Sequence, residues 1–203
     1  MMRKVIFATG NKNKLEEVRQ ILSGLDLEVV SMKDAGFDIE IEENGSSFAE
    51  NSLLKAGAVA AASGEITLAD DSGLEIDAFG GEPGIYSARY MGYDTPYEEK
   101  NARILERMKN VAENERTARF VCAITAVFPD GRKIVCQESF EGIIGYEICG
   151  EHGFGYDPIF YLPELGKYSA ELDPEDKNAI SHRGKALREM AAKLAILKKY
   201  GKL

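Results

Sequence analysis

Hydrophobic residues along the chain follow two periods, one typical of helices and one typical of strands. Apolar residues spaced three and four positions apart predict helices over residues 11–23 and 95–110, and a last helix that ends near Leu197. A capping-box pattern followed by an alanine-rich stretch predicts a helix over residues 46–63. Short apolar runs predict strands over residues 3–9, 27–31, 66–69, 116–128 and 133–144. The order of strand, helix and strand at the start is typical of a βαβ unit, so we expect an α/β fold with a partly parallel sheet.

Acid groups interrupt one of these strands. Between Leu68 and Leu74 stand Asp70, Asp71 and Ser72, followed by a glycine. A strand of the core has no structural need for two adjacent carboxylates, so the pattern predicts a break in the strand that presents acid groups. Carboxylates suit Mg²⁺ as ligands, and one that is not a ligand could orient or deprotonate an attacking water. The alternative is a turn whose Asp and Ser side chains bond their own backbone.

Residues 9–14, with the sequence TGNKNK, form a turn between the first strand and the first helix. Backbone N–H groups and the positive end of the helix dipole meet at such a turn, so it favours an anion, and Lys12 and Lys14 add positive charge there. The spacing does not fit the phosphate-binding pattern GxxxxGK[ST]. The alternative is an Asn-capped turn with solvated lysines.

An acidic connector, residues 38–44, precedes the second helix. If the connector folds toward Asp71, Glu43 is the candidate to complete a metal site, because it is the glutamate nearest to the helix that follows. The alternative is a solvated charged loop. On that helix Asn51 and Lys55 lie four positions apart and share one face, so both could point at the same ligand. We interpret them instead as an ordinary polar face.

A glycine-rich loop over residues 150–160 is the second feature that indicates a ligand. Its glycines leave space for a flat molecule, on which Phe154 or Tyr156 could stack as aromatic residues do on nucleic-acid bases. Asp157 could then bond the edge of such a ring. The alternative is a loop that buries its aromatic side chains in the core.

His182 and Arg183 stand near the start of the last helix, where positive charge opposes the helix dipole. This placement predicts an anion or a carbonyl acceptor nearby. The alternative is a pair of ordinary surface residues.

Composition narrows the class of protein. The chain has 203 residues, of which 44% are hydrophobic and 29% charged, which suits one soluble core or one core drawn out into two lobes. It has neither a long apolar run nor a convincing signal peptide, so we expect a cytoplasmic protein that does not enter a membrane. The net charge of −9 argues against binding of nucleic acid. Three cysteines without a CxxC pair argue against a disulfide framework or a zinc site.

Several distinctive strings occur in one order across nearly the whole chain. They are TGNKNK after the first strand, the glutamates before Gly45, ADDSGLEIDA with GGEPGIYSARY, GFGYDPIF and AISHRGKAL. In this order the chain closely resembles the inosine/xanthosine triphosphate pyrophosphatase family, also called Ham1-like house-cleaning nucleotide pyrophosphatases. DDSGL, PGIYSARY, GFGYDP and SHRG are long and unusual strings, so the resemblance is specific.

The resemblance implies a fold and an activity. The fold would be a single ITPase-like domain over residues 1–203, an α/β fold with an elongated mixed β-sheet flanked by helices and two lobes with a central active-site cleft. The activity would be Mg²⁺-dependent hydrolysis of non-standard purine nucleoside triphosphates, such as ITP, dITP and XTP, to the monophosphate and pyrophosphate, which cleanses the nucleotide pool. The protein would be a homodimer acting on this small-molecule substrate.

The resemblance also assigns residues to the substrate and the metal. The residues that would bind substrate are Thr9, Gly10, Asn11, Lys12, Asn13 and Lys14 at the triphosphate, Ser72, and Phe154, Gly155, Tyr156, Asp157, Lys177, His182 and Arg183 at the nucleobase. Glu43 and Asp71 would bind Mg²⁺, and Asp71 would also be the base toward water. Metal ligation lowers the basicity of a carboxylate, so either Asp70 or Asp71 could be the catalytic base or the ligand.

Two other functions remain open. One is a metal-dependent phosphatase that acts on other nucleotides or on sugar phosphates. The other is a nucleotide-binding module without turnover. The intact DDSG string argues against a binding module, because such a module needs no carboxylate that activates water.

Overall fold

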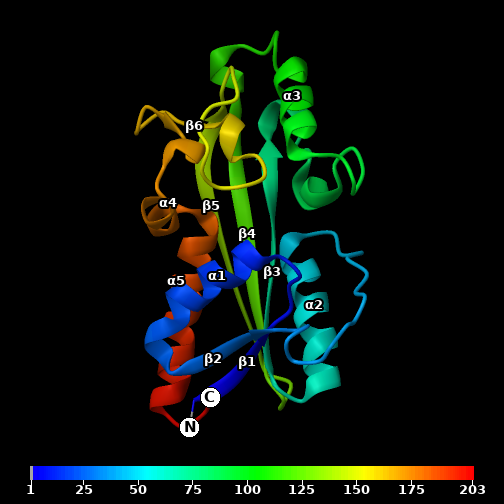
Figure 1. The fold of residues 1–203 in the computed structure, drawn as a ribbon, viewed down its shortest axis with the longest axis vertical. Helices are drawn as coiled ribbons and strands as arrows, with labels where there is room; N and C mark the ends of the chain where they lie inside the picture. Colours follow the sequence, from blue (N-terminus) through cyan, green and yellow to red (C-terminus); the bar gives the residue numbers. More distant parts are fainter. Residues whose placement is uncertain (1) are drawn as a thin grey trace. The chain divides into compact units, whose positions relative to one another are not determined.

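A computed structural model describes residues 2–203, and within that range the strands form a seven-stranded sheet (Figure 1). Along the sheet the strands follow the order β2-β1-β3-β4-β5-β6-β7. The strands are β1 Arg3–Phe7, β2 Leu27–Ser31, β3 Ile66–Ile76, β4 Thr117–Val127, β5 Lys133–Ile144, β6 Phe160–Leu162 and β7 Lys167–Tyr168. The α-helices are α1 Lys12–Leu22, α2 Phe48–Ser63, α3 Tyr97–Arg107, α4 Pro174–Ile180 and α5 His182–Lys199.

The sheet is mixed. β1 pairs in parallel with both β2 and β3, whereas β6 pairs antiparallel with β5 and with β7. The predicted α/β class, with a mixed sheet flanked by helices, is therefore confirmed. Within residues 2–203, none of the helices combines the length and the apolar composition that crossing a bilayer requires.

The described chain divides into two compact units. The first contains the chain up to Asp71 together with Cys122–Glu138 and Arg183–Leu203, and the second contains Ser72–Val121 and Ser139–His182. The single domain over residues 1–203, its elongated shape and its central cleft stay predictions.

In the first unit, alternate residues of β1 enter two different apolar cores. Val5 and Phe7 pack with residues of α1 and α5, whereas Ile6, and Ala8 directly after the strand, pack with residues of α2. Successive side chains of a strand point to opposite faces of a sheet. Helices α1 and α5 therefore cover one face of this part of the sheet, and α2 covers the other (Figure 1).

The strand order changes sides at β1, because β2 lies beside one edge of β1 and β3 lies beside the other edge. The chain passes from β1 through α1 to β2 on one side, and through α2 to β3 on the other side of β1. In open α/β sheets, ligands bind in the crevice outside the carboxyl ends of the strands at such a point. β1 ends at Phe7, which is in register with Leu68 of β3, so residues 9–14 and the next residues of β3 meet that crevice.

β3 corrects one sequence prediction. The pattern predicts a break at Asp70 and Asp71, but β3 runs without interruption from Ile66 to Ile76. The strand tolerates both carboxylates because adjacent residues point to opposite faces, where each one meets a cation of a covering helix. The sequence pattern also does not predict β6, β7 or α4, because each of them is too short for a hydrophobic period to show.

The second unit has its own apolar core, in which Leu74 of β3 and Ile104 of α3 are fully buried. Arg116, with 1% of its surface exposed, donates hydrogen bonds to the carbonyl oxygens of Met108 and Ile144, each at 2.7 Å, and also to the next carbonyl of the chain. A cation at the carboxyl end of α3 suits the helix dipole. Arg116 thus ties the end of α3 to the end of β5.

Gly73 lets the loop after β3 pack directly on the strand. Ser87 Oγ accepts a hydrogen bond from the backbone N–H of Leu74 at 2.9 Å and donates one to the carbonyl oxygen of Gly84 at 2.7 Å. A Cβ atom on Gly73 would lie 2.4 Å from both the Gly84 oxygen and Ser87 Oγ. The glycine of the DDSG string is therefore required by close packing rather than by a break in the strand.

We expect Gly73→Ala to lower the free energy of unfolding by about 2 kcal/mol, because the added methyl group overpacks this contact. Gly57→Ala in α2 is the matched control, since a Cβ atom there meets nothing within 4 Å. We expect that control to raise the free energy of unfolding by about 0.5–1 kcal/mol, as alanine favours a helix over glycine. Chemical denaturation measures both values, and equal stability of the two variants would contradict the packing argument.

Candidate functional site

The turn after β1 is organised by Asn11, the N-cap residue of α1. Asn11 Oδ1 accepts hydrogen bonds from the backbone N–H groups of Asn13 and Lys14, at 2.9 and 3.3 Å. Thr9 Oγ1 accepts one from the backbone N–H of Asn11 at 3.1 Å. Two of the amides expected to bind an anion therefore serve the cap. The exposed residues of the turn are Gly10, Asn11, Lys12 and Asn13.

Asp70 lies on the face of β3 that α1 and α5 cover, with 2% of its surface exposed. Lys14 Nζ of α1 donates to Asp70 Oδ1 at 2.9 Å, and Arg183 Nε of α5 donates to Asp70 Oδ2 at 3.1 Å. Burial by itself would raise the pKa of Asp70, but the charges of Lys14 and Arg183 outweigh it and hold this pKa well below its usual range. Asp70 is therefore ionised, with both oxygens bonded to cations.

Arg183 also bonds a second carboxylate. Its Nη1 donates to Glu17 Oε2 of α1 at 2.8 Å, and the Arg183 side chain is buried. The anion expected near the start of the last helix is therefore confirmed, and the protein itself supplies it through Asp70 and Glu17. Two carboxylates offset the unfavourable position of this cation at the helix start.

Asp71, the next residue of β3, points to the opposite face, toward α2. Lys55 Nζ of α2 lies 3.2 Å from Asp71 Oδ1. Burial raises the pKa of Asp71, and Lys55 offsets only part of that rise. Asp71 Oδ2 is buried and has no hydrogen-bond partner among residues 2–203. A buried carboxylate oxygen without a partner is costly, which marks this atom as one available to a cation or a water.

The acidic connector folds back onto α2, as the metal hypothesis requires. Glu43 Oε1 lies 3.2 Å from Lys55 Nζ, so Glu43 and Asp71 share one ammonium group. Asn51 is fully buried, and its Oδ1 accepts a hydrogen bond from the backbone N–H of Gly45 at 2.8 Å. The interpretation of Asn51 and Lys55 as an ordinary polar face is therefore wrong, because this face of α2 packs against the sheet beside Asp71.

The donor set fits a hard divalent cation. Among residues 2–203, no group of three or more His, Cys, Asp or Glu residues is arranged to hold a metal ion by itself. Magnesium is usually held by one or two carboxylates, and water and substrate phosphates complete its shell. Glu43 and Asp71 form such a pair of carboxylates, and Asp71 Oδ2 is an oxygen not yet used by the protein.

In the second unit, Asp157 organises the glycine-rich loop. Its Oδ2 accepts hydrogen bonds from the backbone N–H of Phe154 at 2.8 Å and from Lys177 Nζ at 2.5 Å. Its Oδ1 accepts one from Ser169 Oγ at 2.9 Å. The side chain is buried, so Asp157 bonds three donors of the protein instead of standing open toward a ring edge, as the sequence suggests.

The glycines of this loop are required by backbone conformation and by close packing. Gly150 has a φ of +86°, and a Cβ atom there would lie 2.3 Å from the backbone of Ala170. Gly153 has a φ of +76°, and a Cβ atom there would lie 2.3 Å from Asp157 Oδ2. A side chain at either position would be strained, whether or not a ligand is bound.

The two aromatic residues of the loop differ in their surroundings. Tyr156 is buried, its hydroxyl donates to the carbonyl oxygen of Ser87 at 2.8 Å, and its ring meets the ring of Tyr97 edge to face at 5.2 Å. Phe154 is half-buried, and Lys177 Nζ lies 5.2 Å from its ring centroid. Phe154 is therefore the better candidate to stack on a base.

His182 and Ser72 are the remaining residues of the second unit that are predicted to bind substrate. His182 is buried, and its ring stacks on Phe120 with centroids 5.0 Å apart and an angle of 12° between the planes. Ser72 is half-buried on β3, one residue after Asp71. Each unit thus gathers part of the predicted set. That both parts hold one ligand stays a prediction.

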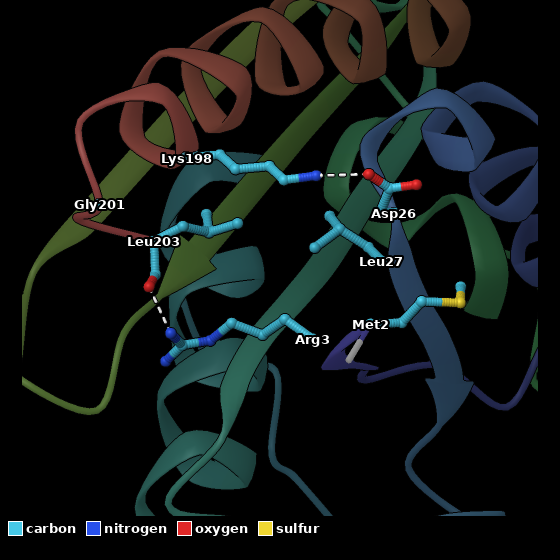
Figure 2. Close-up of a pocket in the computed structure, with 7 residues that line it drawn as sticks. All are labelled: Met2, Arg3, Asp26, Leu27, Lys198, Gly201 and Leu203. Carbon is cyan, nitrogen blue, oxygen red and sulfur yellow. Dashed lines mark hydrogen bonds and ion pairs between the residues drawn. The ribbon is translucent and has the colours of Figure 1, made fainter.

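A cavity of about 500 Å³ lies in another part of the first unit, where the ends of the described chain meet (Figure 2). Its lining residues are Met2, Arg3, Asp26, Leu27, Lys198, Gly201 and Leu203. Lys198 Nζ bonds Asp26 Oδ2 at 2.8 Å, and Arg3 donates to the carbonyl oxygen of Leu203. These charged groups already bond within the protein, so we place the site at β1 and β3 instead.

Two residues of the site lie outside the predicted set. Lys55 holds Glu43 and Asp71, and Glu17 holds Arg183. A signal exists for Glu17, which stands three positions after Lys14 and so shares a face of α1 with it. For Lys55 the signal is its spacing of four positions from Asn51, which places both side chains on one face of α2.

The fold and the site define an α/β protein that gathers two aspartates, a buried arginine and two half-buried lysines at the carboxyl end of its first strand. The model of the Ham1 family matches residues 5–193, and the chain belongs to this family. The resemblance seen in the sequence strings is thereby confirmed.

Relatives of known name agree with this membership. The chain is 45% identical over 195 residues to a protein of Clostridium perfringens named dITP/XTP pyrophosphatase, with 93% of this chain and 96% of that protein covered. It is 49% identical over 187 residues to the protein of the same name from Thermus thermophilus, with 92% and 89% covered. The solved structure of a HAM1 protein from Coxiella burnetii matches with a TM-score of 0.89 and 38% identity, covering 96% of this chain and all of that one.

Proposed function

We propose that this chain hydrolyses non-standard purine nucleoside triphosphates, such as ITP, dITP and XTP, to the nucleoside monophosphate and pyrophosphate, with Mg²⁺ as cofactor. Membership of the Ham1 family and the names of the relatives support the proposal. The observation that carries it is the pair Asp70 and Asp71. One carboxylate is fully bonded to cations, while the other has an unpartnered buried oxygen beside Glu43.

The turn at residues 9–14 binds the triphosphate. The chain carries a net charge of −9, so local positive charge must attract a polyanion against the overall field. The amino-terminal end of α1, Lys12 and Lys14 supply that charge. Asp70 holds the Lys14 ammonium at 2.9 Å, which orients the lysine before substrate arrives.

Asp71 Oδ2 accepts the proton of the attacking water. The water oxygen bonds to the α-phosphorus, the bond from that phosphorus to the α,β-bridging oxygen breaks, and pyrophosphate leaves. In the protein without metal, burial raises the pKa of Asp71, and its Oδ2 has no hydrogen-bond partner among the described residues, so this oxygen is available to take up the proton. Asp70 is unsuited to this role, because both its oxygens bond cations and its pKa is held low.

Glu43 and Asp71 would hold Mg²⁺, which when bound neutralises charge on the phosphate oxygens. The lysine between them, Lys55, keeps the two carboxylates in place and balances part of their charge. The two oxygens of Asp71 divide the two roles: Oδ1, beside Lys55, would face the metal, and Oδ2, which has no hydrogen-bond partner in the described chain, would face the attacking water.

Ser72 contacts the substrate, and the residues proposed for the nucleobase are Phe154, Gly155, Tyr156, Asp157, Lys177, His182 and Arg183. Phe154 stacks on the purine, and Asp157 keeps the loop in shape through its bonds to Lys177 and to the Phe154 amide. His182, fixed on Phe120, directs a donor at the 6-keto oxygen of hypoxanthine or xanthine. Adenine carries an amino donor at that position, so two donors would oppose each other.

We also propose that the protein is a homodimer and acts in the cytoplasm. Large apolar side chains remain exposed on the single chain, among them Tyr93 and Tyr146 with 78% and 65% of their surfaces exposed. Such residues suit a contact with a second copy.

A product assay tests the proposed reaction. Purified protein is incubated with Mg²⁺ and each of ITP, dITP, XTP, ATP and GTP, and phosphorus NMR identifies the products. We expect pyrophosphate from the first three, at a kcat/KM at least about 100-fold above that for ATP, and no turnover in excess EDTA. Orthophosphate as the product would indicate another phosphatase, and tight binding without any product would indicate a binding module.

A further inference from the structure

Helix α3 holds two separate loops of the second unit through one face. Tyr97, Lys100 and Asn101 lie three and four positions apart, so their side chains share that face. Lys100 Nζ donates a hydrogen bond to the carbonyl oxygen of Ala88, in the loop after β3, at 2.8 Å. Asn101 Nδ2 donates one to the carbonyl oxygen of Gly155, in the glycine-rich loop, at 3.1 Å.

The two loops are also joined to each other above this helix face. Tyr156 donates its hydroxyl hydrogen to the carbonyl oxygen of Ser87 at 2.8 Å, and its ring packs edge to face against Tyr97. Lys100, Asn101 and Tyr156 each expose 3% of their surface or less. Contacts buried to this degree exclude water and fix the geometry of the groups that make them.

Asn101 is the polar side chain that fastens the glycine-rich loop to α3. The Gly155 carbonyl oxygen needs a donor, which assigns the amide nitrogen of Asn101 to that contact. The other end of the amide, Oδ1, is buried and has no hydrogen-bond partner in the part of the chain that the structure describes. An unsatisfied buried acceptor destabilises a fold, so leucine, of similar volume, would suit the core better. The asparagine therefore serves the contact with Gly155.

Gly155 is the residue through which this contact acts on Phe154. It has no side chain and has a φ of +72°, so its own contacts with the protein run through its backbone. Its neighbours in sequence are Phe154 on one side and Tyr156 on the other. Fixing the Gly155 carbonyl fixes the peptide planes that orient the Phe154 ring.

We propose that Asn101 is a positioning residue that holds the Gly155 carbonyl and so sets the orientation of Phe154 and the choice between purine bases. The inference rests on the proposed function, since it deepens the account of the nucleobase pocket. It assigns a role in base discrimination to a residue of α3, which none of the sequence strings includes.

Asn101→Leu tests this role, with Ile104→Val as the matched control. Leucine removes the donor at similar volume, whereas Ile104→Val trims a fully buried residue of the same helix and keeps the hydrogen bond from Asn101 to Gly155. We measure kcat and KM for ITP and GTP, and the inhibition constant of inorganic tripolyphosphate, which has no base. For Asn101→Leu we expect KM for ITP to rise about tenfold and the preference for ITP over GTP to fall about tenfold, with tripolyphosphate inhibition unchanged. For Ile104→Val we expect the KM for ITP, the preference for ITP over GTP and the inhibition by tripolyphosphate to equal those of the wild type.

Two results would overturn the inference. One is a KM and an ITP/GTP preference equal to those of the wild type, and the other is an equal weakening of tripolyphosphate, which would indicate a general disruption. If the wild-type protein releases no pyrophosphate from ITP, the proposed reaction fails by itself. Calorimetry with inosine monophosphate then still tests Asn101, because a tenfold weaker affinity in Asn101→Leu supports the role and an unchanged affinity rejects it.

Discussion

In the Asp71→Asn variant, the turnover number with ITP is expected to fall by about a thousandfold, while the affinity for ITP in the presence of Mg²⁺ stays close to that of the wild type. The amide keeps the shape of the side chain but cannot accept the proton of the attacking water. The triphosphate still meets Lys12, Lys14 and the amino-terminal end of α1. Steady-state kinetics and calorimetry measure the two quantities.

The matched control for this variant is Glu75→Gln, four residues further along β3. Glu75 lies 3.8 Å from a guanidinium nitrogen of Arg119 and belongs to the second unit. Removing its charge also changes a carboxylate of the same strand, yet we expect turnover to remain at the wild-type level. Asp71→Asn with turnover within tenfold of the wild type would remove Asp71 from the mechanism.

The second large effect is expected on stability, in Asp70→Asn. This substitution leaves Lys14 and Arg183 without the carboxylate that both of them bond in a buried place. Removing one partner of a buried ion pair is strongly destabilising because the remaining charge is not compensated. We expect the free energy of unfolding to fall by about 3 kcal/mol, measured by chemical denaturation.

The control for this effect is Asp26→Asn at the chain ends (Figure 2). Asp26 bonds Lys198 at 2.8 Å, but its side chain is 80% exposed, so water replaces the lost contact. We expect this variant to be nearly as stable as the wild type. Equal losses in Asp70→Asn and Asp26→Asn would show that burial does not decide the strength of the Asp70 pairs.

The two aspartates differ because a strand turns adjacent side chains to opposite faces. Asp70 meets α1 and α5, with a cation from each, whereas Asp71 meets α2, with Lys55 and the acidic connector. One residue therefore stabilises the first unit and positions Lys14, and the other has an oxygen available for chemistry. The order of the residues in DDSG does not distinguish these roles, but the two faces of the sheet do.

The sequence predicts those parts of the fold that depend on local periodicity. The strand at residues 27–31 and the helix around Val18 agree with the structure, because apolar residues recur on the buried side of each. The helix around Ala56 agrees because its cap at Ser47 and its alanines favour a helix locally. The predicted break in β3 is wrong, because a sequence does not show that a buried carboxylate will meet a cation from a distant helix. Arg183, the partner of Asp70, lies 113 positions away along the chain.

The sequence also predicts one part of the candidate site and leaves another part undetermined. The sequence strings identify the turn, the carboxylates and the glycine-rich loop, because their residue types are unusual for a core. They do not reveal which atoms remain available, since that depends on contacts between distant elements. Asp157 is an example, because its place in GFGYDP suggests a base contact, whereas Ser169 and Lys177 occupy its oxygens.

The central claim is that water attacks the α-phosphorus of a non-standard purine triphosphate. The most direct test is to run the ITP reaction to a single turnover in water enriched in ¹⁸O and to locate the label by mass spectrometry. We expect one ¹⁸O atom in inosine monophosphate and none in pyrophosphate. Label in pyrophosphate, or in orthophosphate, would place the attack at another phosphorus and rule out the proposed reaction.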